Sequence, residues 1–262
     1  MYTVLLLIVL LFCIIIVGQK LFRNNELFTD MNIRNYSNFE SHINTFSGKK
    51  KYVLIFTGGP TLKEFKKDNL PDYVWDNSYV IAVKNAVNHL HDIDVKPDFL
   101  VTNFIGAAER IDFEKIPDSS INIGLNYGSL PKLKQKMHYT VNLVNSSNAM
   151  KMVKEDVKGI EFKNIDNVLY SNWGHVMMEL AIPLTILLKP QEIITIGWDI
   201  KNSKKHWDTR RESFTNWSHE DTILNEFSCH LHDYMKKHYN IKIYKINKNS
   251  AIKLPYFRIN NI

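Results

Sequence analysis

The sequence predicts an α/β domain with a mainly parallel sheet that is covered by helices on both faces. Short apolar runs typical of buried strands recur along the chain, and helical stretches lie between most of them. Strands that alternate with helices form parallel sheets, and the connecting helices cover the two faces. The expected strands are residues 52–57, 79–83, 98–102, 121–125, 140–144, 192–197 and 241–246. Longer helices are expected over residues 172–188 and 219–238.

The composition is that of one globular domain with room for an anchor. Hydrophobic residues make up 45% and charged residues 23% of the 262 residues, so a normal core can form. Cys13 lies in an apolar segment and Cys229 in a predicted helix, so no disulfide framework is expected. The chain contains no CxxC or HExxH pattern that would indicate a zinc site.

The N-terminal segment predicts a membrane anchor over residues 1–18. Residues 3–17 are apolar and uncharged, although the run is shorter than the roughly 20 residues of a typical spanning helix. A cleaved signal peptide is the alternative, but no basic residue precedes the run, and Val17-Gly18-Gln19 is a poor cleavage site. We therefore expect a single-pass membrane protein. The basic residues Lys20 and Arg23 favour a cytosolic domain, whereas three glycosylation sequons would permit a lumenal one.

After the predicted anchor, the sequence indicates a linker followed by a domain. Residues 19–50 are polar and rich in asparagine, which predicts a linker with room for one short helix. Residues 51–262 carry the strand and helix pattern and form the predicted α/β domain.

The charge of the chain indicates an anionic partner. The net charge is +6 and the pI is near 9.1, which suits nucleic acid, an anionic membrane face or a phosphorylated small molecule. No compact motif of basic and aromatic residues is present, so we expect no nucleic-acid partner.

The first predicted strand leads into a turn, Gly58-Gly59-Pro60-Thr61, which we call the glycine turn. Two glycines allow a close backbone approach, and Pro60 suits the first turn of a helix. A helix that starts here would present free amides to an anion. The turn matches neither the Walker loop nor the GxGxxG fingerprint, so a tight turn without a ligand is the alternative.

Amide side chains follow several of the predicted strands. Asn85 and Asn103 come at the ends of the second and third strands, where they could bind sugar hydroxyls or base edges. Asparagine is also a common turn and cap residue, which is the alternative interpretation. Asn172, Trp173 and Gly174 precede the long predicted helix, either as a further ligand cradle or as a helix cap with a packing glycine.

The strand over residues 192–197 is followed by Asp199 and a polar, basic stretch. A basic loop at the carboxyl end of a strand could close over phosphates, or it could be a solvated surface loop. Its members are Lys201, Lys204, Lys205, His206, Trp207, Arg210 and Arg211. His219 then opens the last long helix, where the helix dipole favours the neutral imidazole that a general base requires. A structural histidine is the alternative.

In their order along the chain, these motifs resemble those of bacterial lipooligosaccharide sialyltransferases. Their wider relatives include proteins similar to 6-hydroxymethylpterin pyrophosphokinases. The (N)GPSL turn of that group is similar to GGPTL at residues 58–62, and its two strand-end asparagines to Asn85 and Asn103. Its Thr-Ser-Gly-Val segment resembles residues 172–175, and its KEIYLSGIDF strand resembles QEIITIGWDI at residues 191–200.

Two later motifs complete the resemblance, which covers about residues 52 to 255. The catalytic Gly-His-Ser of the group resembles Ser218-His219-Glu220, and its late Asn-Ser pair resembles Asn249-Ser250.

The resemblance implies a Rossmann-type, GT-A-like domain that uses a CMP-sugar donor without a metal or a cofactor. His219 would take the proton of the acceptor hydroxyl while the anomeric carbon is attacked with inversion. The glycine turn, Asn85, Asn103 and residues 172–174 would hold the nucleotide and the sugar. Asp92-Ile93-Asp94 matches the DxD pattern of metal-dependent glycosyltransferases, but it precedes a strand and so lies at the wrong edge for this site.

The chain departs from the pattern of the group at three places. Gly58 replaces the asparagine that opens the turn, and Asn172-Trp173 replaces the Ser/Thr before the glycine. Lys201 and Trp207 stand at the spacing of two tyrosines that stabilise the leaving phosphate. Lys201, Lys204 or Arg210 could supply positive charge instead.

The sequence therefore predicts a membrane-anchored, sialyltransferase-like glycosyltransferase. Its expected partners are a nucleotide-sugar donor, a glycan or glycolipid acceptor, and the membrane. A pyrophosphokinase-like enzyme that uses ATP, and a non-catalytic relative that binds a glycan, are the alternatives.

Overall fold

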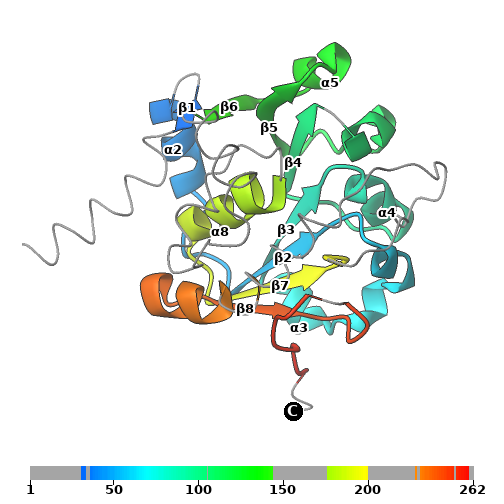
Figure 1. The fold of residues 1–262 in the computed structure, drawn as a ribbon, viewed down its shortest axis with the longest axis vertical. Coiled ribbons are helices and arrows are strands. Elements are labelled where there is room, and N and C mark those ends of the chain that lie inside the picture. Colours follow the sequence, from blue (N-terminus) through cyan, green and yellow to red (C-terminus); the bar gives the residue numbers. More distant parts are fainter. Residues whose placement is uncertain are drawn as a thin grey trace, which may run out of the picture.

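The computed structural model describes residues 31–33, 36–104, 106–143, 176–199, 228, 231–250 and 252–259. Its centre is an eight-stranded sheet with the order β1-β6-β5-β4-β3-β2-β7-β8 (Figure 1). The strands are β1 (Met31–Ile33), β2 (Tyr52–Phe56), β3 (Ser78–Val83), β4 (Phe99–Phe104), β5 (Ile121–Gly128), β6 (Tyr139–Leu143), β7 (Glu192–Ile196) and β8 (Lys242–Lys245).

The pairing of the strands confirms the predicted α/β fold. β2 to β8 are joined by parallel pairs, and only the short β1 runs antiparallel, against β6. All seven predicted strands are present, with ends that differ from the prediction by a few residues.

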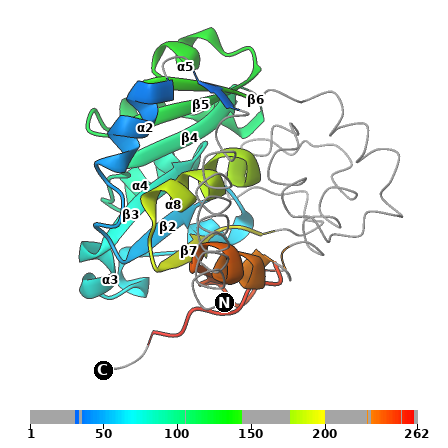
Figure 2. The same cartoon turned by 90° about the vertical axis from the view of Figure 1, so that its left-hand side faces the viewer.

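Helices cover both faces of the sheet, as Figures 1 and 2 show. One face carries α2 (Tyr36–Asn44), η5 (Met177–Ala181, a π-helical turn), α8 (Ile182–Leu188) and the helical residues 231–239. The other carries η1 (Pro60–Glu64), η2 (Lys67–Asn69), α3 (Asp72–Asp76), α4 (Ala86–Asp92), η3 (Gly106–Arg110), η4 (Phe113–Lys115) and α5 (Pro131–Gln135).

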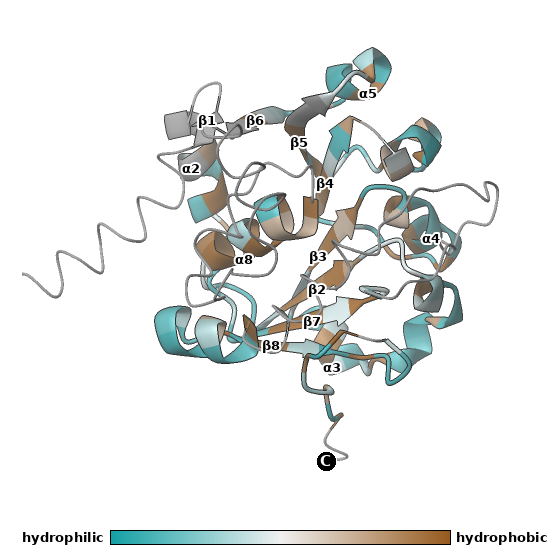
Figure 3. Ribbon diagram, viewed as in Figure 1, coloured by the Kyte–Doolittle hydropathy of each residue, from teal (hydrophilic) through white to brown (hydrophobic). Residues whose placement is uncertain are grey.

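The core forms two layers because successive strand side chains point to opposite faces. In β2, Val53 and Ile55 join the layer under α8, whereas Leu54 and Phe56 join the layer under α3 and α4. All four side chains are fully buried. Figure 3 shows the result: the central strands and α8 are largely hydrophobic, and hydrophilic residues lie on the outer helices.

Part of the stretch predicted as a linker belongs to the folded domain. Residues 36–44 form α2, and Phe39 and Ile43 of this helix are fully buried in the core. Residues 31–33 add β1 to the edge of the sheet. The asparagine-rich composition concealed this, because Phe39 and Ile43, the buried apolar residues described for α2, are isolated among polar residues and lie four residues apart on one helical face.

The predicted anchor, residues 1–18, lies outside the part of the chain that the structure describes. Within the described residues, no helix has both the length and the apolar character that crossing a bilayer requires.

The long buried helix predicted over residues 172–188 is described from residue 176 onward, and it contains a π turn. Pro183 lacks the N–H that would bond the carbonyl of Glu179 four residues earlier, so the regular α-helical ladder is interrupted here. The π turn η5 packs against β3 and β4. It therefore places the fully buried Glu179 near these two strands.

Candidate functional site at the carboxyl edge

Two turns meet where the winding of the sheet reverses direction. β2 and β7 are parallel neighbours, but the chain leaves β2 toward β3 and leaves β7 toward β8 on the other side. Ligands of open α/β sheets bind in the crevice at such a switch point. At this switch point lie the glycine turn after β2 and the turn Gly197-Trp198-Asp199 after β7, which we call the aspartate turn.

Hydrogen bonds join these two turns directly. The Gly59 N–H donates to the carbonyl of Gly197 at 2.9 Å. The Thr61 N–H donates to Oδ2 of Asp199 at 2.6 Å, and the Thr61 hydroxyl donates to Oδ1 at 2.8 Å. Both carboxylate oxygens of Asp199 are thus bound to Thr61. The sequence analysis expected the N–H groups of this turn to bind an anion. The N–H groups of Gly59 and Thr61 instead donate to Gly197 and Asp199 of the protein itself.

Glycine is required at position 59 because no β-carbon fits there, and not because of its backbone conformation. Its φ of −72° is open to any residue. A β-carbon at this position would lie 2.2 Å from the carbonyl oxygen of Gly197 and 2.7 Å from Oδ2 of Asp199. Contacts this short do not occur in folded proteins, so only glycine lets the two turns approach each other.

The Asp199–Thr61 pair predicts a specific pattern of destabilisation. Asp199→Ala removes both acceptors of Thr61, and we expect a loss of about 2 kcal/mol in the free energy of unfolding. Asp199→Asn keeps an oxygen for the Thr61 N–H and an amide that can donate to the Thr61 hydroxyl. We expect it to lose less than half as much in urea denaturation. Equal stability of the alanine variant and the wild type would contradict this role.

Ser250, from the predicted Asn249-Ser250 motif, supports the same region. Its buried hydroxyl donates to the carbonyl of Trp198 at 2.8 Å, next to Asp199. This contact ties the segment after β8 to the aspartate turn.

Asn85 lies at the carboxyl end of β3 with an unsatisfied amide. Its side chain is 0% exposed, and neither Oδ1 nor Nδ2 has a hydrogen-bond partner among the described residues. Asn85 precedes α4, but its side chain makes no capping hydrogen bond. A buried unsatisfied polar group costs about 1–3 kcal/mol. The side chain therefore does not cap the helix, and its hydrogen-bonding groups are unused by the described residues.

Asn103 lies near the end of the neighbouring strand β4, as predicted. The register pairs Val83 with Val101, so Asn85 and Asn103 follow equivalent positions on β3 and β4. Asn103 is 1% exposed, and the Thr102 hydroxyl donates to its carbonyl at 2.7 Å, where the β4 register shifts. The structure thus brings the two predicted asparagines to adjacent strand ends.

The structure adds two charged residues that sequence reasoning missed. Lys84 directly precedes Asn85, and burial lowers the pKa of its ammonium to about 8, while the charge of Glu179 acts in the opposite direction. Glu179 is 0% exposed. One signal was available in the sequence, because Glu179 is the only charged residue in the otherwise apolar stretch 176–188.

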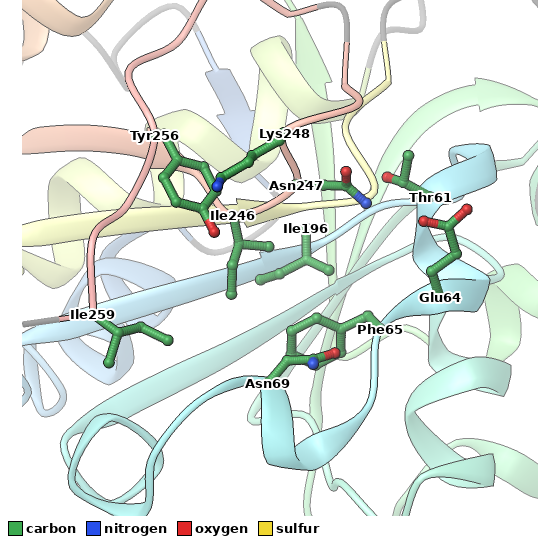
Figure 4. A pocket seen from close by; sticks show the side chains of 10 residues that line it. All are labelled: Thr61, Glu64, Phe65, Asn69, Ile196, Ile246, Asn247, Lys248, Tyr256 and Ile259. Carbon is green, nitrogen blue, oxygen red and sulfur yellow. The ribbon is translucent and has the colours of Figure 1, made fainter. Parts of the chain in front are cut away.

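A hollow of about 260 Å³ opens beside η1 (Figure 4). Phe65, Ile196 and Ile246 give it an apolar wall, and Thr61 connects it to the glycine turn. It is formed largely by the C-terminal segment, which sequence reasoning did not assign to a site. Its lining residues are Thr61, Glu64, Phe65, Asn69, Ile196, Ile246, Asn247, Lys248, Tyr256 and Ile259.

The remaining predicted site residues are Asn172, Trp173, Gly174, Lys201, Trp207 and His219, and they lie outside the described residues. Asp92 ends α4 and Asp94 follows it, so both precede β4 and lie at the edge opposite the site, as expected. In the parts of the chain that the structure covers, no group of three or more metal-binding side chains is present.

Comparison with known proteins gives one family and several similar folds. A family model described as 6-hydroxymethylpterin diphosphokinase MptE-like matches residues 29–205, which confirms the resemblance to that wider group. No curated protein sequence matches the chain significantly.

Structures of a sialyltransferase and of a further glycosyltransferase are among the solved structures with a similar fold. A variant of the sialyltransferase CST-II in complex with CMP matches with a TM-score of 0.45 and 16% identity, over 79% of this chain and 86% of that chain. CstII from Campylobacter jejuni with CMP matches with a TM-score of 0.42 and 17% identity, over 79% and 84%. A MAf glycosyltransferase from Magnetospirillum magneticum AMB-1 matches with a TM-score of 0.40 and 17% identity, over 67% of this chain and 28% of that one.

Proposed function

Because the chain belongs to the 6-hydroxymethylpterin diphosphokinase MptE-like family, we propose that it binds a nucleotide at the carboxyl edge of its sheet and transfers a group from it. The ordered motifs that resemble lipooligosaccharide sialyltransferases favour a sugar as that group and a CMP-sugar as the donor. The acceptor is a hydroxyl of a glycan or glycolipid.

One observation carries this proposal. The amide of Asn85 is fully buried and lacks a hydrogen-bond partner among the residues described, at the edge where α/β sheets bind nucleotides. A nucleotide or sugar supplies the donors and acceptors that this amide requires. Asn103 follows the equivalent position of the adjacent strand, and we assign it to the same ligand site.

In the proposed reaction, His219 takes the proton of the acceptor hydroxyl as that oxygen attacks the anomeric carbon. The bond from this carbon to the phosphate oxygen breaks, the configuration inverts, and CMP leaves with the electron pair. Lys201, Lys204 or Arg210 neutralises the charge on the leaving phosphate. The reaction requires neither a metal nor a cofactor. The apolar residues 1–18 hold the enzyme at a membrane, where a glycolipid acceptor is accessible.

The test combines nucleotide binding with transfer. The full-length chain in detergent is screened by thermal shift against CMP, UDP, GDP and ATP, and CMP is expected to stabilise it selectively. Asn85→Leu keeps the size of the side chain without its amide, so it is expected to fold normally and lose this shift. His219→Ala is expected to keep the CMP shift and lose sugar transfer. Transfer that survives in His219→Ala would remove His219 as the base.

The name of the matched family favours one alternative, a diphosphokinase that uses ATP. Selective stabilisation by ATP in the same screen would support this alternative and exclude the CMP-sugar proposal.

A further inference from the structure

Lys84 and Asn85 are adjacent at the carboxyl end of β3, and both carry polar groups that the described protein leaves unbound. We propose that they form an anion-binding subsite, in which the Lys84 ammonium contacts an oxyanion of the donor, either its phosphate or a carboxylate on its sugar. This inference rests on the proposed function, because it assigns a role within the same nucleotide site.

The backbone places Lys84 at the edge in an unusual way. Its φ is +54°, in the left-handed region that residues other than glycine seldom adopt. Its main-chain N–H still donates to the carbonyl of Val101 at 2.9 Å, so β3 and β4 stay paired up to this residue. The left-handed conformation ends the strand directly before Asn85.

The Lys84 ammonium has no ion pair within the described residues. The negative charge of Glu179 raises the pKa of Lys84, but the two side chains are not within the 4.0 Å that defines a salt bridge. Glu179 therefore favours the charged lysine without occupying its donors. Most of Lys84 is buried, and only a part of the residue retains exposed surface.

Lys245, in contrast to Lys84, has a structural role. Lys245 is also partly buried, and its ammonium donates to the carbonyls of Ser250 at 2.7 Å and Ile252 at 2.8 Å. Lys84 has no comparable hydrogen bonds among the described residues. A largely buried cation that makes no hydrogen bonds is unfavourable for folding, and a bound anion would offset this cost.

The chemistry of the pair suits an oxyanion. An ammonium provides up to three donors and the Asn85 amide provides two more, whereas phosphate and carboxylate oxygens accept charge-assisted hydrogen bonds. The Asn85 oxygen remains available for a hydroxyl of the same ligand.

The test compares Lys84→Met with the wild type by calorimetry on the full-length chain in detergent. CMP, cytidine and a CMP-linked sugar acid are the probes, and Lys96→Met, which removes an exposed lysine, is the matched control. If Lys84 binds the phosphate, CMP binds about tenfold more weakly to Lys84→Met and cytidine binds equally. If Lys84 binds the carboxylate, only the CMP-linked sugar acid loses affinity. Unchanged affinity for both anionic ligands would overturn the proposal.

Parallel titrations with ATP and adenosine separate this inference from the proposed function. If ATP is the nucleotide that binds and Lys84→Met weakens it about tenfold, the subsite stands and the CMP-sugar proposal fails. If CMP binds equally to both proteins, and the CMP-linked sugar acid does too, the subsite fails and the proposed function stands. Binding of no nucleotide to the wild type overturns both. Lys84→Gln repeats the comparison if Lys84→Met does not fold.

Discussion

Gly59→Ala is expected to destabilise the domain by about 3–4 kcal/mol. The added methyl group would overlap main-chain atoms, which cannot move aside as a flexible side chain can. The added methyl group would lie 2.2 Å from the carbonyl oxygen of Gly197, which is part of the main chain. Relief of the overlap requires the glycine and aspartate turns to separate. Separation breaks the bond from Gly59 to Gly197 and strains both bonds between Thr61 and Asp199. Urea denaturation of the full-length chain measures the effect.

Gly48→Ala is the matched control for Gly59→Ala. Gly48 has a φ of +72°, and nothing lies within 4 Å of an added β-carbon. Its substitution introduces backbone strain without steric overlap, so we expect a cost of only about 1 kcal/mol. A cost for Gly59→Ala no larger than that for Gly48→Ala would show that the two turns are not in close contact.

Lys84→Met is expected to stabilise the ligand-free protein by up to about 3 kcal/mol at pH 7. The Lys84 ammonium titrates near 10.5 in the unfolded chain, and burial lowers its pKa to about 8 in the folded protein. Below pH 8 the folded state must hold the charge at a cost. Between pH 8 and 10.5 the folded state has released the proton and the unfolded state still binds it. The stability of the wild type therefore rises with pH across this window.

The measurement is the difference in unfolding free energy between Lys84→Met and the wild type from pH 7 to pH 10.5. The difference is expected to be largest at pH 7 and to shrink toward pH 10.5, and contributions of other groups cancel in the subtraction. Glu179 is the charged group of the described residues that acts on Lys84, and its attraction already reduces the shift. Lys96→Met, which removes an exposed lysine, is measured in parallel as the control. A destabilised Lys84→Met at pH 7 would indicate that Lys84 has a structural partner.

These expectations divide the carboxyl edge of the sheet into two parts. On the side of β2 and β7, Gly59, Thr61 and Asp199 satisfy one another and hold the turns together. On the side of β3 and β4, the Asn85 amide remains unsatisfied among the described residues, and the neighbouring Lys84 ammonium interacts with Glu179 only through its charge. The glycine turn was the first anion-binding site that the sequence suggested. In the structure, its N–H groups at Gly59 and Thr61 hold it against the aspartate turn. The unsatisfied amide of Asn85, which we propose as part of the ligand site, lies one strand away.

The amino-acid sequence by itself determined the parallel sheet and the neighbouring positions of Asn85 and Asn103. Apolar runs and the alternation of strands with helices are local patterns, and they suffice to place strand ends at one edge. The sequence did not reveal α2 as part of the core, because its polar composition hid the contribution of Phe39 and Ile43.

Only the tertiary structure decided which polar groups bind each other and which do not. Thr61 and Asp199 are 138 residues apart in the chain, and nothing in either local sequence indicates their pairing. Likewise, Lys84 reads as an ordinary surface lysine until η5 brings Glu179 near it and burial lowers its pKa. Hydrogen bonds and desolvation depend on distances between segments that are remote in sequence, so they emerge only when the segments pack.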